Sequence, residues 1–91
     1  MAIHWAHSAD KHGIDRADAL NAIEQYLHWI REFDEPRVTG GRRPDLFIGP
    51  TRDRRMLLEV IVELRPPTEI LVFHVMEARR KMLEIAERET T

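Results

Sequence analysis

An almost continuous apolar run from Arg55 to Leu64 constrains the fold of this 91-residue chain more than any other feature. The run is rich in β-branched residues, which predicts a strand buried on both faces. A tight connection, Arg65-Pro66-Pro67-Thr68, follows it and leads into a second apolar run, Glu69 to Val75. We therefore expect the two runs to pair as adjacent antiparallel strands of a hairpin or meander.

The first third of the chain predicts one short strand and two helical segments. Alternation over Ala2 to Ala6 favours a strand, and Ser8 to Gly13 is typical of a helical turn that a glycine C-cap ends. Asp15 is a candidate N-cap for an amphipathic helix over about 15–29. The residues expected to pack this helix across one face of the sheet are Leu20, Ile23 and Leu27.

The remaining segments complete a single domain over residues 1–91. Pro36 makes Trp29 to Val38 an edge strand or an extended loop, while Asp45 to Pro50 is expected to be a strand and Glu77 to Glu89 a helix. The predicted order is β, α, α, β, β, β, β, α. This order indicates an α+β two-layer fold, an antiparallel meander packed against N-terminal helices with a C-terminal helix.

Composition narrows the possible functions. The absence of cysteine excludes disulfides, thiol nucleophiles and thiolate metal sites. A net charge of −2 argues against bulk attraction to nucleic acid or to an anionic membrane. The segment from Arg37 to Arg55 contains six arginines and only two acids, which indicates either a phosphate-facing surface or solvated loop charges. With no apolar stretch of about 20 residues and no leader at Met1 to Ser8, we expect a cytoplasmic protein with no membrane contact.

Four short motifs in chain order resemble a known family. They are Lys11-His12-Gly13-Ile14 before the amphipathic helix, Ile48-Gly49 at a strand end, the long apolar strand, and Glu77-Ala78-Arg79 after the last strand. Together they resemble the BrnT-like toxins of the RelE/ParE-like superfamily. The resemblance implies a RelE/ParE-like two-layer fold and the toxin of a bacterial type II toxin-antitoxin system. It also implies a metal-independent endoribonuclease that an antitoxin encoded beside it neutralises.

The resemblance also assigns residues. Lys11 and His12 match its basic-His-Gly motif, Arg54 or Arg55 its basic residue at the start of the long strand, and Arg79 its arginine after the last strand. The chain departs from the family in two loop segments, 31–36 and 39–41, and in lacking an aromatic residue near the end of the final helix.

RNA cleavage by 2′-hydroxyl attack needs a base, an acid and cationic groups around the phosphate. His12 could move the proton, and Lys11, Arg55 and Arg79 could hold the phosphate. His12 could equally be a histidine stabilised at a helix C-terminus. His74 is either a satisfied sheet histidine or, beside Glu77 and Arg79, part of an anion site. The candidates for RNA binding are Arg42, Arg43, Arg52, Arg54 and His74.

Other polar and aromatic residues give weaker signals. His4 and His7 lack the partners of a zinc site, so we expect neither a metal nor a cofactor. Trp5 and Trp29 could stack on bases but are more typical of a core. Glu59 and Glu63 share one face of a strand, either as paired carboxylates or as solvated outward positions.

Two functions therefore compete. The first is the ribonuclease toxin, with RNA as substrate and a cognate antitoxin as partner. The second is a non-catalytic protein-binding module of the same fold, which the overall acidity favours. Convergence of Lys11, His12, Arg55 and Arg79 in one groove would favour the enzyme. Such apolar strands in so short a chain also predict an edge or patch covered by another chain, either a partner or a copy in a homodimer.

Overall fold

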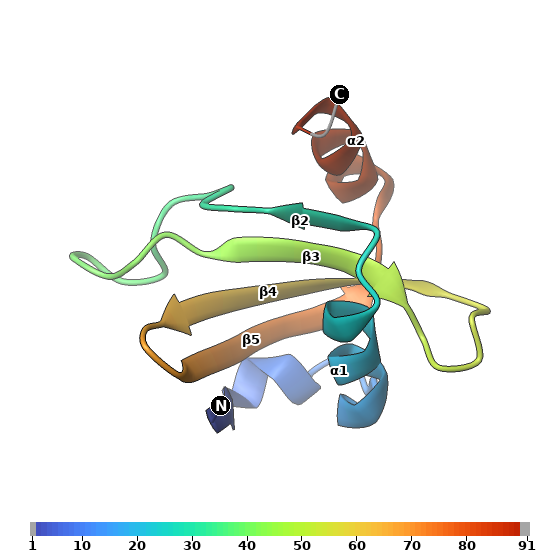
Figure 1. Ribbon diagram of the computed structural model, residues 1–91, viewed down its shortest axis with the longest axis horizontal. Helices are drawn as coiled ribbons and strands as arrows, with labels where there is room; N and C mark the ends of the chain where they lie inside the picture. Colours follow the sequence, from blue (N-terminus) through green and yellow to red (C-terminus); the bar gives the residue numbers. More distant parts are fainter. Residues whose placement is uncertain (1, 90–91) are drawn as a thin grey trace.

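A five-stranded mixed sheet organises the chain in the computed structural model, which describes residues 2–89 (Figure 1). The strand order is β1-β5-β4-β3-β2. The strands are β1 (Ala2–Trp5), β2 (His28–Ile30), β3 (Asp45–Pro50), β4 (Leu57–Arg65) and β5 (Glu69–Glu77). The helices are the 3-10 helix η1 (His7–Asp10), α1 (Arg16–Glu24) and α2 (Arg80–Glu89). The predicted α+β class and element order are confirmed.

The central hairpin matches the sequence prediction. β4 and β5 pair antiparallel from Leu58 opposite Glu77 to Arg65 opposite Glu69. β4 contributes buried side chains to both faces of the sheet, as its apolar run predicts. With β3 and the edge strand β2, it completes a four-stranded antiparallel meander.

The expectation of a purely antiparallel sheet is wrong, because β1 runs parallel to β5. Their register places Ala2 opposite Glu69 and Trp5 opposite Val72. The pairing continues as Ala6 N–H donates to the Val72 carbonyl, just before the chain turns into η1, which packs on β5. β1 thus covers the first part of the β5 edge, and the edge beyond Val72 is left to η1 and the residues that follow it.

Helix α1 ends at Glu24, five residues before the predicted end at Trp29. Asp15 is the N-cap, as predicted, and its carboxylate accepts from Ala17 N–H. Trp29 packs against the core on the α1 side of the sheet, and Ile30 packs against the core on the α2 side. Successive side chains point to opposite faces only in a strand, so the helix has to end before these residues. Leu27 is consequently 58% exposed, so the predicted helix packing through Leu27 is wrong, whereas Ile23 does pack against the core.

Two hydrophobic clusters fill the two faces of the sheet, and Figure 1 shows α1 and α2 on opposite sides of the strands. The predicted two-layer arrangement is therefore wrong, because each face of the sheet carries a helix. The α1 side holds Phe47, Leu58, Val60, Val62, Val72 and Val75. The α2 side holds Ile30, Leu46, Ile48, Met82 and Ala86. Helix α2 begins at Arg80 and not at the predicted Glu77, because β5 extends to Glu77 and Ala78 N–H donates to the Leu57 carbonyl. Within residues 2–89, no helix has the length and apolar character to cross a bilayer.

Gly49 allows α1 to lie directly on β3. A Cβ at this position would lie 2.8 Å from the Ala22 Cα and closer still to its carbonyl oxygen. Gly49→Ala is therefore expected to lower the free energy of unfolding by about 2 to 3 kcal/mol, because helix backbone cannot move aside as a side chain can. Urea denaturation would measure this loss. Gly40→Ala is the control, because no atom lies within 4 Å of its added Cβ and only the positive φ of 80° opposes it; equal losses in the two variants would contradict the account.

Candidate functional site

A β-bulge in β5 places two consecutive side chains on the α2 side of the sheet. The register shifts where Ile61 faces His74 and Val62 faces Val72. Val72 and Val75 both pack into the core on the α1 side, so Phe73 and His74 between them face the other way. Bulges commonly re-aim side chains beside functional sites. Here the bulge presents His74 next to an aromatic ring.

Glu59 is the centre of the polar cluster on that side. Its side chain is fully buried, and its Oε2 lies 2.8 Å from His74 Nε2. Arg79 donates to the same carboxylate from its backbone N–H at 2.9 Å and from its guanidinium, with Nη2 2.7 Å from Oε2. Of the two interpretations of Glu59, the solvated outward position is excluded, because its carboxylate is buried and held by His74 and Arg79. Glu63 is also buried and accepts from Arg65 Nε at 2.6 Å.

The two partners keep the Glu59 carboxylate ionised. Burial alone would raise its pKa, but hydrogen bonds from His74 and Arg79 outweigh burial and lower the pKa from 4.5 to about 2. An ionised carboxylate can only accept, so His74 Nε2 must carry the proton of this hydrogen bond. Glu59 thus fixes the orientation of the His74 ring and leaves Nδ1 as the nitrogen available for proton transfer.

Because the pKa of Glu59 is lowered in the folded protein, the free energy of unfolding depends on pH in the acid range. The carboxylate stabilises the fold fully above its unfolded pKa of about 4.5, and this contribution is lost as the pH falls towards about 2. The shift corresponds to about 3 kcal/mol. We expect the free energy of unfolding of the wild type to fall by that amount between pH 4.5 and 2, over and above the fall seen in the Glu59→Gln protein. Urea denaturation at a series of pH values would measure both. Parallel pH curves for the two proteins would contradict this.

His12 joins the cluster from the other end of the chain. Its ring lies edge-on to the His74 ring, with centroids 5.9 Å apart and the planes at 74°. The turn after η1 carries His12, and Ser8 Oγ fixes η1 on β5 by donating to the Phe73 carbonyl at 2.6 Å. The structure therefore brings together the exposed imidazole of His12 and the half-buried imidazole of His74, which the buried carboxylate of Glu59 holds.

Arg79 borders an open groove beside this cluster. The groove has a volume of about 270 Å³ and lies between α2 and the loop from Arg31 to Pro44. Asp34, Ile61 and Lys81 also line it, whereas His12 and His74 do not. The Arg79 side chain is 40% exposed although Glu59 holds its Nε and Nη2. A guanidinium with one end fixed and the other accessible can bind an anion in a set position.

The other two predicted phosphate ligands lie differently. Lys11 is exposed at the end of η1, directly before His12. Arg55 lines a separate pocket of about 430 Å³ together with Asp15, Asp18 and Asp53. These acids make that pocket unfavourable for a phosphate. The predicted convergence is therefore partial, because His12 and Arg79 meet through His74 and Glu59 while Arg55 faces acids.

Arg52 and Arg54, two of the predicted RNA-binding residues, belong to the β3–β4 loop. Arg52 pairs with Asp18 at 2.9 Å and with Asp15 at 3.3 Å, and it lowers the pKa of the Asp18 carboxyl through a hydrogen bond. Arg54 is exposed in the turn, with φ of 62°. Neither residue takes part in the cluster around His74.

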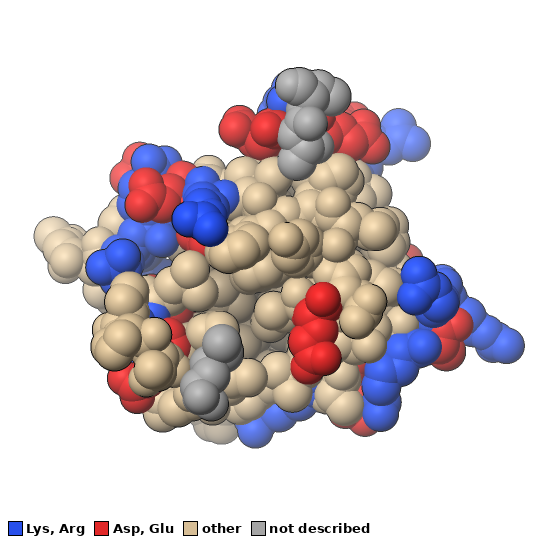
Figure 2. All heavy atoms as spheres, viewed as in Figure 1, with Lys and Arg blue, Asp and Glu red and all other residues tan. Residues whose placement is uncertain are grey.

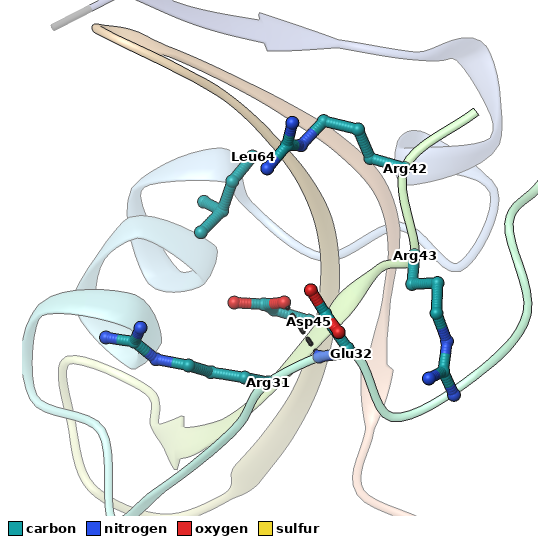
Figure 3. Close-up of a pocket in the computed structure, with 6 residues that line it drawn as sticks. All are labelled: Arg31, Glu32, Arg42, Arg43, Asp45 and Leu64. Atoms are coloured by element: carbon teal, nitrogen blue, oxygen red, sulfur yellow. Dashed lines mark hydrogen bonds between the residues drawn. The ribbon is translucent and has the colours of Figure 1, made fainter.

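Arg42 and Arg43 line a pocket of about 360 Å³ together with Arg31 (Figure 3). Its buried Asp45 accepts from Trp29 Nε1 at 2.8 Å and from the Glu32 backbone N–H at 3.0 Å. The pocket lies on the α1 side, where Trp29 packs against the core, and the Arg43 guanidinium points away from Asp45 (Figure 3). The two loop arginines are thus separate from the histidine pair.

Charge is distributed accordingly over the surface. Figure 2 shows basic and acidic side chains mixed at both ends and at the top of the view, with an acidic group and otherwise uncharged side chains between them. Among residues 2–89, no group of three or more His, Asp or Glu side chains is placed to hold a metal ion. Trp29 stacks on Phe47 with centroids 5.2 Å apart, and Trp5 packs against the same core, which confirms the core interpretation of both tryptophans.

Sequence reasoning missed Glu59 as a member of this site. The signal was present, because a glutamate inside an apolar strand, a histidine inside the next and an arginine just beyond it are each costly to bury alone. The pairing of Glu59 with His74 and Arg79 offsets the cost of burying each of them.

No family model matches the chain, and neither a curated protein nor a solved structure was found to match it.

Proposed function

We propose that this protein is a metal-independent endoribonuclease and the toxin of a bacterial toxin-antitoxin pair, neutralised by a partner protein. The observation that carries the proposal is the His12–His74 pair, 5.9 Å apart, with His74 oriented by the buried Glu59. The BrnT-like motifs support the same assignment, since His12 and Arg79 are matched residues and both belong to this cluster. A RelE/ParE-like fold is part of the proposal.

Two adjacent imidazoles can perform the whole reaction. One, in its neutral form, takes the proton of the ribose 2′-hydroxyl as the 2′-oxygen attacks the phosphorus. The other, protonated, gives its proton to the departing 5′-oxygen. The P–O5′ bond breaks as the P–O2′ bond forms, which yields a 2′,3′-cyclic phosphate and a free 5′-hydroxyl.

Arg79 would stabilise the phosphorane charge. Its guanidinium is oriented before substrate arrives, because Glu59 accepts from Nε and Nη2. A preorganised donor of this kind contributes more than a mobile one, since no reorganisation is needed as charge develops. Glu59 is a positioning residue here, acting through His74 and Arg79.

A non-catalytic binding module is the second candidate, and the positions of the other arginines favour it. Arg52 is neutralised by two aspartates, Arg55 faces acids, and Arg42 and Arg43 line a pocket on the α1 side. A module would use such mixed-charge surfaces for a protein partner and would leave the histidine pair as a structural contact.

Controlled expression in bacteria separates the two candidates. The toxin proposal predicts growth arrest and loss of RNA integrity on induction, and rescue by co-expression of the protein encoded beside it. Induction of a His12→Ala variant to equal abundance should leave growth and RNA intact. Harmless expression of the wild-type chain, combined with capture of that neighbouring protein, would favour the module.

A further inference from the structure

We infer that Arg37, which contacts Phe73 directly before His74, forms a second phosphate subsite beside the histidine pair, and that the preferred substrate is therefore single-stranded RNA longer than a dinucleotide. This inference rests on the proposed function. None of the motifs that resemble the toxin family includes Arg37, which lies between the two segments, 31–36 and 39–41, where the chain departs from that family.

The contact between Arg37 and Phe73 places a cation beside the histidine pair. The guanidinium carbon of Arg37 lies 4.5 Å from the centroid of the Phe73 ring. Phe73 and His74 are the two residues that the bulge turns to the α2 side. The loop that connects β2 to β3 thus reaches β5 and brings positive charge to the residue directly before His74.

The loop is anchored on both sides of Arg37. Phe33 packs against the core on the α2 side, and its N–H donates to the Pro44 carbonyl at 3.0 Å. Arg43 Nε donates to the Asp34 carbonyl, also at 3.0 Å. Arg37 is therefore presented from a held loop base, which lowers the entropy lost when a ligand binds.

Arg37 keeps its hydrogen-bonding capacity. A guanidinium over an aromatic ring uses its face, so that its N–H groups, which lie in its plane, stay available for phosphate oxygens. None of the ion pairs found among residues 2–89 includes Arg37, whereas Glu59 engages Arg79 and two aspartates engage Arg52.

The placement assigns different phosphates to the two arginines. Arg79 is tied through Glu59 to His74 and would serve the phosphate that is cleaved. Arg37 contacts the ring beside His74 and would serve the next phosphate along the strand. A substrate with one phosphate cannot occupy both positions, so the length of the RNA reports on Arg37.

The test measures binding of two uncleavable probes, a 2′-O-methyl tetranucleotide and a 2′-O-methyl dinucleotide with one phosphate. Arg37→Ala is expected to weaken tetranucleotide binding about tenfold and to leave dinucleotide binding unchanged, because one charge-assisted contact is lost. The slope of log affinity against log salt for the tetranucleotide should fall by about 0.7. Arg37→Lys should recover part of the affinity.

Arg31→Ala is the matched control. Arg31 starts the same loop, and its guanidinium lies 4.4 Å from the Trp29 ring centroid, but on the α1 side of the sheet. The Arg31→Ala protein should bind both probes as tightly as the wild type does. Equal effects of Arg37→Ala on the two probes, or no effect on either, would overturn the inference. Probe binding that depends on Arg37 in a protein that cleaves no RNA would overturn the proposed function instead.

Discussion

Replacement of His74 by alanine is expected to lower kcat for RNA cleavage by about 10²- to 10⁴-fold, the range that a general acid or base contributes. His12→Ala should lower kcat by a similar factor, and each variant should lose one limb of the pH profile, since one of the two groups that transfer protons is then absent. The double variant should be little worse than either single variant, because both residues act in one step. Cleavage of a fluorogenic oligoribonucleotide would measure these rates.

His4→Ala provides the control for loss of a histidine. His4 also bonds a glutamate, with Nε2 2.9 Å from Glu69 Oε1, but that pair is half exposed and belongs to the β1 edge. The His4→Ala protein should cleave RNA at the wild-type rate. A His74→Ala protein that remains folded and retains the wild-type kcat would contradict the acid–base role of the pair.

Removal of the Glu59 carboxylate should produce the largest loss of stability. Glu59→Ala leaves the Arg79 guanidinium and the His74 ring without their common acceptor and opens a cavity, which is expected to cost about 3 to 5 kcal/mol. Small domains are stable by only about 5 to 15 kcal/mol, so this variant would be close to unfolding at 37 °C. Thermal and urea denaturation would measure the loss.

Glu69→Ala is the matched comparison for this second prediction. Glu69 accepts from a histidine at nearly the same distance as Glu59 does, 2.9 Å against 2.8 Å, but its side chain is half exposed and that of Glu59 is fully buried. Exposed pairs contribute about 0 to 1 kcal/mol. Similar losses for the two glutamates would show that burial of the Glu59 cluster does not have the energetic role assigned to it.

The parts of the fold set by local pattern could be predicted from sequence, and the parts set by distant pairing could not. The apolar run of β4 and its hairpin with β5 follow from composition and turn residues. Helix α1 was predicted too long, because the apolar spacing continues beyond Glu24 while pairing with β3 turns residues 28–30 into a strand. The parallel addition of β1 depends on a strand more than 60 residues away, which no local signal reports.

The site shows the same division. Motif spacing pointed to His12 and Arg79 separately, but only the bulge in β5 explains why His74 stands beside His12 and why Phe73 faces the same way. The excess of arginine between Arg37 and Arg55 is compatible with either a phosphate-facing surface or solvated loop charges. The structure separates these arginines, because Arg37 contacts Phe73 on β5, Arg42 lines a pocket with Leu64, and Arg52 pairs with Asp18.

Identification of the RNA ends left by the purified protein in the presence of a chelator tests the central claim most directly. The histidine-pair mechanism predicts fragments with 2′,3′-cyclic phosphate and 5′-hydroxyl ends, formed at the same rate with and without the chelator and absent with His12→Ala. Intact RNA, or fragments that carry 3′-hydroxyl and 5′-phosphate ends, would contradict it.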